Sequence, residues 1–422
     1  MPGSISCYQC AEYNQISSGV MLPRRGMKIM KFSLFMMPCH HPKENPALAF
    51  QRDIDLIQLA DKLGFDEAFI GEHHSGGWET MPAPEMALSM AAAKAQRIRL
   101  GTSVFSAPFH HPFYLAERMA FLDHLTYGRA ILGVGPCSLV TDKILFNMEE
   151  DALVPMLHEA VDVIVRLLES EEPVSHRGEF WEFEDLHLQL RSFQKPRLPI
   201  AMPSAATPAN LEMIGRNDMI WLSPTGKNRP DARRNWEIVE KGAREAGKVA
   251  NRDNWRIATY MYLAETREQA WDEVREGIMR EAEYFSAIGL QGHYAEYEGQ
   301  PFSEFTPESC ADRRDWVIGT PDDAIGWIEA KIKETGGFGG MLLHSPEWTD
   351  RFKWERSMEM FARYVMPNFQ GHNVNFGREW QAIKAKSKNG KISRNIGNRP
   401  SNLSMTEPNR IKPIKPKLVA RK

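Results

Sequence analysis

The segment with the most chemically active residues is Glu72-His73-His74, which runs into Ser75 and two glycines. Histidine titrates near neutral pH, so this trio can exchange protons with a substrate. The same residues could equally form a hydrogen-bonded structural pair, and their spacing does not decide between the two interpretations. Histidine and carboxylate also bind zinc or iron, but adjacent side chains rarely reach the same ion. We therefore predict no metal.

A second segment of interest is Ser204-Ala205-Ala206-Thr207, which precedes Pro208. Small residues ahead of a helix leave backbone N–H groups free, and such groups favour a phosphate. A plain N-cap by Thr207 would account for the same residues. Both interpretations remain open from the sequence alone.

The pair His110-His111 is chemically active but sits before Pro112, which forces an extended residue ahead of it. We expect these histidines to satisfy loop carbonyl groups. Cys39 and Cys137 have no assignable activating base, so we expect them to be packing residues.

Strand-like and helix-like segments alternate through the body of the chain, which favours an α/β fold. Eight such repeats predict a closed (β/α)8 TIM barrel with insertions, with a hairpin over 173–191 and a loop-rich stretch over 289–317. Active sites of such barrels lie at the carboxyl ends of the strands, where both segments above are found. The expected strands are 31–37, 65–70, 98–105, 130–134, 198–202, 218–222, 256–264 and 340–344.

The composition is that of a soluble globular protein, with 422 residues, 42% hydrophobic and 25% charged. The net charge of −3 divides unevenly, because residues 371–422 hold 13 Lys and Arg against two acids, which leaves −14 on the rest. An acidic body argues against nucleic acid as a partner. No apolar run is long enough for a membrane span. The five cysteines are scattered, which favours a reducing compartment, the cytoplasm.

The two ends of the chain differ from this body. Residues 1–30 are expected to be a flexible extension, in which the Cys7-x-x-Cys10 pair is inert. Residues 31–370 would form the barrel. Residues 371–422 form a basic tail, expected to be disordered over 385–422, where two prolines prevent a helix near 411–417.

Several segments in order resemble the luciferase-like flavin monooxygenases, and the resemblance covers roughly residues 30–370. Within this family the chain is most similar to limonene 1,2-monooxygenase-type members. The matching runs are FDEAFIGEHH at 65–74, IRLGTSVFSAPFHHP at 98–112, GRAILGVGP at 128–136, IGTPDD at 318–323 and FARYVMP at 361–367.

The resemblance implies an enzyme that uses reduced FMN, supplied by a separate flavin reductase. With O2 it would form a flavin C4a-hydroperoxide and oxygenate a small apolar substrate such as a terpene or an aldehyde; a homodimer is expected. By position, His73 matches the catalytic histidine, flanked by Glu72 and His74. The positions implied for cofactor binding are Ser103 and Val104, whose peptide bond would be cis beneath the flavin ring; Pro136 and Cys137; Ser204, Ala205, Ala206 and Thr207 at the phosphate; and Ser223 at the ring edge.

The chain also departs from the family pattern. Pro136 stands where luciferases proper have arginine, Cys137 where limonene-type members have glycine, and Val154 and Met156 where relatives place arginines. Two alternatives therefore stay open. One is a flavin- or deazaflavin-dependent dehydrogenase on the same barrel, and the other is a non-catalytic flavin-binding relative.

Overall fold

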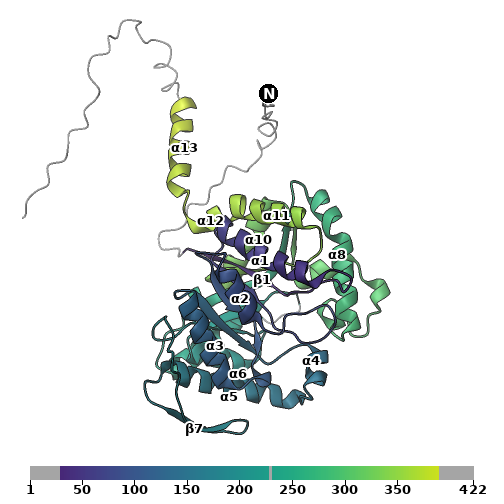
Figure 1. Ribbon diagram of the computed structural model, residues 1–422. Coiled ribbons are helices and arrows are strands. Elements are labelled where there is room, and N and C mark those ends of the chain that lie inside the picture. Colours follow the sequence, from purple (N-terminus) through teal and green to yellow (C-terminus); the bar gives the residue numbers. More distant parts are fainter. Residues whose placement is uncertain (1–28, 228–230, 389–422) are drawn as a thin grey trace, which may run out of the picture. The chain divides into compact units, whose positions relative to one another are not determined.

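A computed structural model describes residues 29–227 and 231–388. Eight parallel strands close into a barrel, each strand pairing with the next and the last with the first. The predicted barrel is confirmed (Figure 1). In barrel order the strands are β1 Lys31–Met36, β2 Glu67–Ile70, β3 Arg99–Thr102, β5 Ala130–Gly135, β8 Ile200–Pro203, β9 Ile220–Pro224, β10 Trp255–Leu263 and β12 Gly340–His344.

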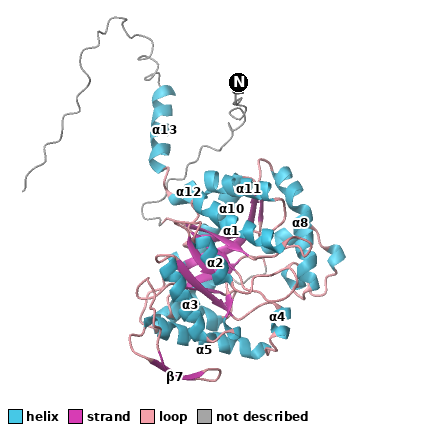
Figure 2. Ribbon diagram, viewed as in Figure 1, coloured by secondary structure: helices cyan, strands magenta, loops and turns pink. Residues whose placement is uncertain are grey.

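Helices surround the strands, as Figure 2 shows. Many begin with proline at the first helical position, where the missing N–H is not needed. One helix carries a capping box between Thr320 and Asp323 and ends at Gly336, whose φ is 79°. The main helices are α1 Pro46–Leu63, α2 Pro84–Ala92, α3 Pro112–Leu125, α5 Glu150–Glu169, α6 Pro208–Arg216, α7 Ala232–Glu245, α8 Arg267–Ala287, α10 Pro321–Thr335 and α11 Arg351–Met360.

The barrel interior is polar toward the amino ends of the strands and apolar above. Nε and Nη2 of Arg256 each donate to Glu67 at 2.9 Å, and Oγ of Ser33 donates to the same carboxylate at 2.7 Å. Burial alone would raise the pKa of Glu67, but the Arg256 guanidinium outweighs it and lowers that pKa to about 2. An apolar cluster that includes Phe35, Phe69 and Leu342 fills the interior above this ion pair.

Several short elements were not expected from the sequence. The strand β4 Phe105–Ser106 and the helix α4 Val140–Leu145 follow β3 and β5. The predicted loop 289–317 contains the helix α9 Pro307–Arg314, followed by the strand β11 Val317–Gly319. The predicted hairpin is confirmed as β6 Val174–Arg177 paired antiparallel with β7 Glu182–Leu186.

Contacts divide the chain into two units, Met1–Gly371 and His372–Lys422. The second contains the helix α13 Val374–Lys388, so the predicted disorder is wrong for residues 385–388. No proline interrupts that stretch, and alanine, lysine and glutamine favour helix. Residues 1–28 of the expected extension over 1–30, with Cys7 and Cys10, and the tail beyond 388 lie outside the described residues. None of the helices in the described ranges is both long and apolar enough to span a membrane.

Candidate active site

Glu72, directly after β2, is a buried acceptor for three donors. Its Oε2 accepts the backbone N–H of Ser106 at 2.6 Å. Its Oε1 lies 2.9 Å from Nε2 of His74 and 2.6 Å from Nε2 of His110. Burial would raise the pKa of this carboxyl, but the hydrogen bonds from His110 and His74 lower it instead. Glu72 is therefore an anion that ties the loop after β2 to the segment after β3.

His73 lies between two other carboxylates. Its Nδ1 is 3.0 Å from Oδ2 of Asp142 on α4, and its Nε2 is 2.9 Å from Oε2 of Glu79. Burial would lower the pKa of His73, yet the hydrogen bond to Asp142 and the contact with Glu79 raise it to about 9. At neutral pH the ring is thus a cation with both nitrogens engaged. The ring can pass a proton to a substrate only if one of these contacts opens.

His74 differs from His73 because only Nε2 is bonded, to Glu72. Its ring packs edge-on against Phe109 and Phe146, with centroids 6.1 and 5.0 Å away. The hydrogen bond to Glu72 raises the pKa of His74. Of the predicted catalytic trio, His74 is the member with a ring nitrogen that has no partner among the described residues.

Asp142 and Glu79 were not predicted from the sequence as partners of His73. Asp142 follows 69 residues later, and Oδ1 also accepts from the backbone of His74 and from Oγ of Ser75. Glu79 is in the same loop as His73, so its position in the sequence could have indicated the contact. Nothing in the sequence indicates that Asp142 lies beside His73. The prediction that His110 and His111 satisfy loop carbonyl groups is wrong. Nδ1 of His111 accepts the backbone N–H of Phe113 at the start of α3, and Nε2 of His110 contacts the Glu72 carboxylate.

The Ser103–Val104 peptide bond after β3 is cis, as the resemblance implied. Two glycines leave room for this dipeptide. A Cβ on Gly71 would lie 3.3 Å from the carbonyl oxygen of Ser103, and a Cβ on Gly135 would lie 2.7 Å from Cγ2 of Val104. A side chain at either position would therefore press on the dipeptide. Because glycine stands after β2 and at the end of β5, the dipeptide has room at the mouth of the barrel.

Pro136 and Cys137 continue from β5. Cys137 has a φ of 75°, a left-handed conformation that glycine adopts most easily. Its thiol is buried, and burial raises its pKa to about 11. At neutral pH Cys137 is therefore an unreactive thiol, as expected of a packing residue.

The segment Ser204–Thr207 lies between β8 and α6. The side chain of Thr207 makes no capping hydrogen bond, so the N-cap interpretation does not account for these residues. Oγ of Ser204 is buried and has no hydrogen-bond partner among the described residues. The Ser204 carbonyl accepts from Trp221 at 2.8 Å, and the Ala205 carbonyl accepts from Asn235 at 2.8 Å. These two hydrogen bonds fix the backbone of the loop. The Ser204 hydroxyl and the first N–H groups of α6 remain available to a ligand, and such groups favour a phosphate.

Ser223 does not join the other predicted residues. Its Oγ accepts from Nε1 of Trp255 at 2.8 Å, between β9 and β10. Its neighbour Leu222 belongs to the interior cluster, so the alternation of side chains along β9 directs Ser223 to the outer face of the barrel.

A cavity of about 480 Å³ opens beside this rim, at the carboxyl ends of β1, β10 and β12. Its inner walls are mainly aromatic or apolar but include the buried Glu281, and its outer part lies between α1, α8 and α11. None of the predicted catalytic or cofactor residues lines it. The cavity is nevertheless close to them, because Phe35 in its wall lies about 3.9 Å from where a Cβ of Gly71 would be. Inner wall residues include Phe35, Met37, Trp78, Tyr260, Phe285, His344 and Trp348.

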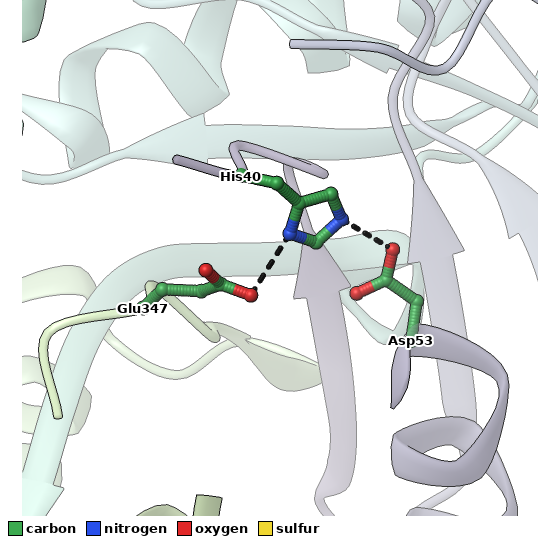
Figure 3. Close-up of side chains that lie close together, drawn as sticks. All are labelled: His40, Asp53 and Glu347. Carbon is green, nitrogen blue, oxygen red and sulfur yellow. Dashed lines mark hydrogen bonds and ion pairs between the residues drawn. The ribbon is translucent and has the colours of Figure 1, made fainter. Parts of the chain in front are cut away.

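At the cavity edge, in the described part of the chain, one group has ligand atoms close enough for a metal ion: His40, Asp53 and Glu347. Figure 3 shows the two carboxylates on opposite edges of the imidazole ring. Asp53 is 2.9 Å from Nε2 and Glu347 is 2.9 Å from Nδ1. Arg52 contacts Glu347 as well. Burial would lower the pKa of His40, but these carboxylates raise it to about 9, so the cluster is a salt-bridged imidazolium rather than a convergent metal site.

The closed barrel, with its polar carboxyl-end rim and adjacent apolar cavity, has the layout of a barrel enzyme that acts on a small molecule. The sequence profile described as luciferase-like monooxygenase matches residues 30–338. The chain belongs to this luciferase-like monooxygenase family.

Individual relatives agree with this assignment. The chain is 36% identical to 4-hydroxyprotoasukamycin monooxygenase of Streptomyces nodosus subsp. asukaensis, over 86% of this chain and 98% of that protein. It is 34% identical to limonene 1,2-monooxygenase of Rhodococcus erythropolis, over 81% and 87%. The oxygenating constituent of 3,6-diketocamphane monooxygenase from Pseudomonas putida, a type II Baeyer–Villiger monooxygenase solved with FMN, has a TM-score of 0.69 at 23% identity, covering 81% and 98%. At that identity the match supports the fold alone.

Proposed function

We propose that this protein uses reduced FMN and O2 to insert one oxygen atom into an apolar organic substrate. The observation that carries the proposal is the buried, unpaired hydroxyl of Ser204 beside the amino end of α6. A buried hydroxyl without a partner is costly, so its presence suggests that a ligand completes it. The phosphate of FMN, held by Ser204, Thr207 and the α6 N–H groups, has the matching chemistry.

The rest of the flavin would lie along the same rim. β3, β5 and β8 are consecutive in the barrel, so Ser103–Val104, Pro136–Cys137 and Ser204–Thr207 are neighbours there. Reduced FMN would supply the two electrons that activate O2. Around it, this chain's residues would orient the ring and hold protons, with His74 the best placed to exchange one and His73 fixing the loop that carries it.

A separate reductase is expected to deliver the reduced flavin. The similar Pseudomonas protein is described as an oxygenating constituent, which implies a second component there. The substrate would occupy the 480 Å³ cavity, whose size is ordinary for small-molecule sites. Aromatic and methionine side chains on its wall favour an apolar molecule.

Replacing Ser204 with alanine tests the phosphate site. Loss of a hydrogen bond to a charged group costs about 1.5–3 kcal/mol, so we expect FMN affinity to fall roughly 10- to 100-fold. Flavin fluorescence titration measures it. Ser192→Ala is the matched control, because Ser192 also has a buried hydroxyl without a partner but lies outside this loop. Equal FMN affinity in wild type and Ser204→Ala would place the phosphate elsewhere.

We also propose that the protein is a homodimer. Exposed apolar side chains form stripes on two adjacent helices, Met86 and Met90 on α2 and Phe121 and Leu125 on α3. An ion pair between Glu85 and Arg118 joins these helices, so the stripes share one surface that a second copy would cover. Sedimentation should give twice the chain mass, and replacement of both Met90 and Phe121 with glutamate should give the monomer. A monomeric wild type would contradict the proposal.

A further inference from the structure

We infer that the cavity is built for an apolar molecule carrying a carbonyl oxygen, which Tyr260 and His344 hold by hydrogen bonds. This inference deepens the proposed function and rests on it, because it specifies the substrate class of the same site. It separates this chain from an enzyme whose substrate is a plain hydrocarbon.

Tyr260 is the first of the two groups. It lies on β10 in register with His344 on β12, and both line the cavity. The Tyr260 hydroxyl has no hydrogen-bond partner among the residues that the structure describes, and it is not completely buried. Burial raises its pKa well above the ordinary value, so it remains a neutral donor. The hydroxyl is therefore available to a ligand in the cavity.

His344 is the second group. Its ring stacks on Tyr260 with centroids 4.2 Å apart and meets Phe35 edge-on at 4.7 Å. Burial, reinforced by the charge of Arg314, lowers the pKa of His344 to about 3. The ring is therefore a neutral imidazole with one N–H donor. Neither nitrogen has a hydrogen-bond partner in the described parts of the chain, in contrast to His40 and His73.

The position of this pair is fixed by its neighbours. The Trp348 ring stacks on Tyr260 at 5.1 Å, and its Nε1 donates to Glu281 at 2.6 Å. The other oxygen of Glu281 accepts from the hydroxyl of Tyr294 at 2.6 Å. Burial raises the pKa of Glu281 to about 7. Glu281 is thus a positioning residue that holds Trp348, which in turn limits how far Tyr260 can move.

Two neutral donors on stacked rings in the cavity wall match the two lone pairs of a carbonyl oxygen. A hydrocarbon of the same shape would fill the cavity but leave both donors without partners, and a site with buried polar groups discriminates strongly against such an analogue. The carbonyl would sit near Phe35, a wall residue that lies about 3.9 Å from where a Cβ of Gly71 would be.

Limonene and carvone test this inference, because they share one carbon skeleton and differ by a carbonyl. Binding to the chain without flavin is measured by tryptophan fluorescence, since Trp78 and Trp348 line the cavity. We expect carvone to bind about 10-fold more tightly than limonene. Tyr260→Phe should remove most of this preference by weakening carvone alone, and His344→Phe should act in the same direction. Carveol, the corresponding alcohol, distinguishes a carbonyl from a hydroxyl and should bind more weakly than carvone.

Tyr297→Phe is the matched control, because that tyrosine is exposed and bonded to Glu304, and it should leave every affinity unchanged. Equal binding of limonene and carvone, absence of carvone binding, or a carvone preference that survives Tyr260→Phe would each overturn the inference. The measurement needs no flavin, so a failure of the proposed monooxygenase activity cannot produce any of these results.

Discussion

Replacing His73 with glutamine is expected to reduce product formation about 100-fold or more while FMN affinity stays within roughly 3-fold of wild type. Glutamine keeps the approximate size but removes the cation between Asp142 and Glu79. Those two carboxylates would then repel each other across the loop that carries Glu72 and His74. The loss should appear in kcat, because none of these residues lines the substrate cavity.

The control for this variant is His187→Gln, since His187 is exposed on the loop after β7. Thermal unfolding and flavin titration show whether the His73 variant still folds and binds FMN. A folded, flavin-binding His73→Gln protein with wild-type turnover would remove His73 from the mechanism.

The second large effect is on stability, at the Glu67–Arg256 pair inside the barrel. Both side chains are buried, with exposed fractions of 0% and 1%. Glu67→Gln would leave the Arg256 guanidinium without a counter-charge, and breaking a buried pair in this way costs about 3–5 kcal/mol. Urea unfolding should show a free energy of unfolding lower by that amount.

Two further variants separate charge from packing. Glu182→Gln removes an exposed ion pair with Arg177 and should change stability by less than about 1 kcal/mol. A Glu67→Gln, Arg256→Met double variant should recover part of the loss, because it leaves no unpaired charge. A single Glu67→Gln variant as stable as Glu182→Gln would show that the pair is not a structural requirement.

The barrel was predictable from the sequence because apolar strands alternate with capped helices. Gly64, Pro112 and the Thr320–Asp323 box mark helix ends by local chemistry. The missed elements are short. The helix α9 was hidden because its residues are mostly polar, and only Cys310 and Ala311 are buried. Such a helix has too weak an apolar pattern to stand out.

Site residues were predictable only where several chemically active or small residues are adjacent in the sequence. Glu72-His73-His74 and Ser204–Thr207 are contiguous, and strand ends are where barrels place chemistry. Asp142 reaches His73 only because α4 packs against the loop after β2, and nothing in the sequence indicates that contact. Tyr260 and His344 come together through the β10–β12 register, which the closure of the barrel determines.

Isotopically labelled O2 distinguishes oxygen insertion supported by reduced flavin from the other proposed activities. The full chain would be given chemically reduced FMN and carvone under labelled gas, and the products analysed by mass spectrometry. We expect one labelled oxygen atom in each product molecule, with the second reduced to water. An oxidised product without the label would indicate a dehydrogenase, and flavin binding without any product would indicate a non-catalytic relative; either result would exclude oxygen insertion by this protein.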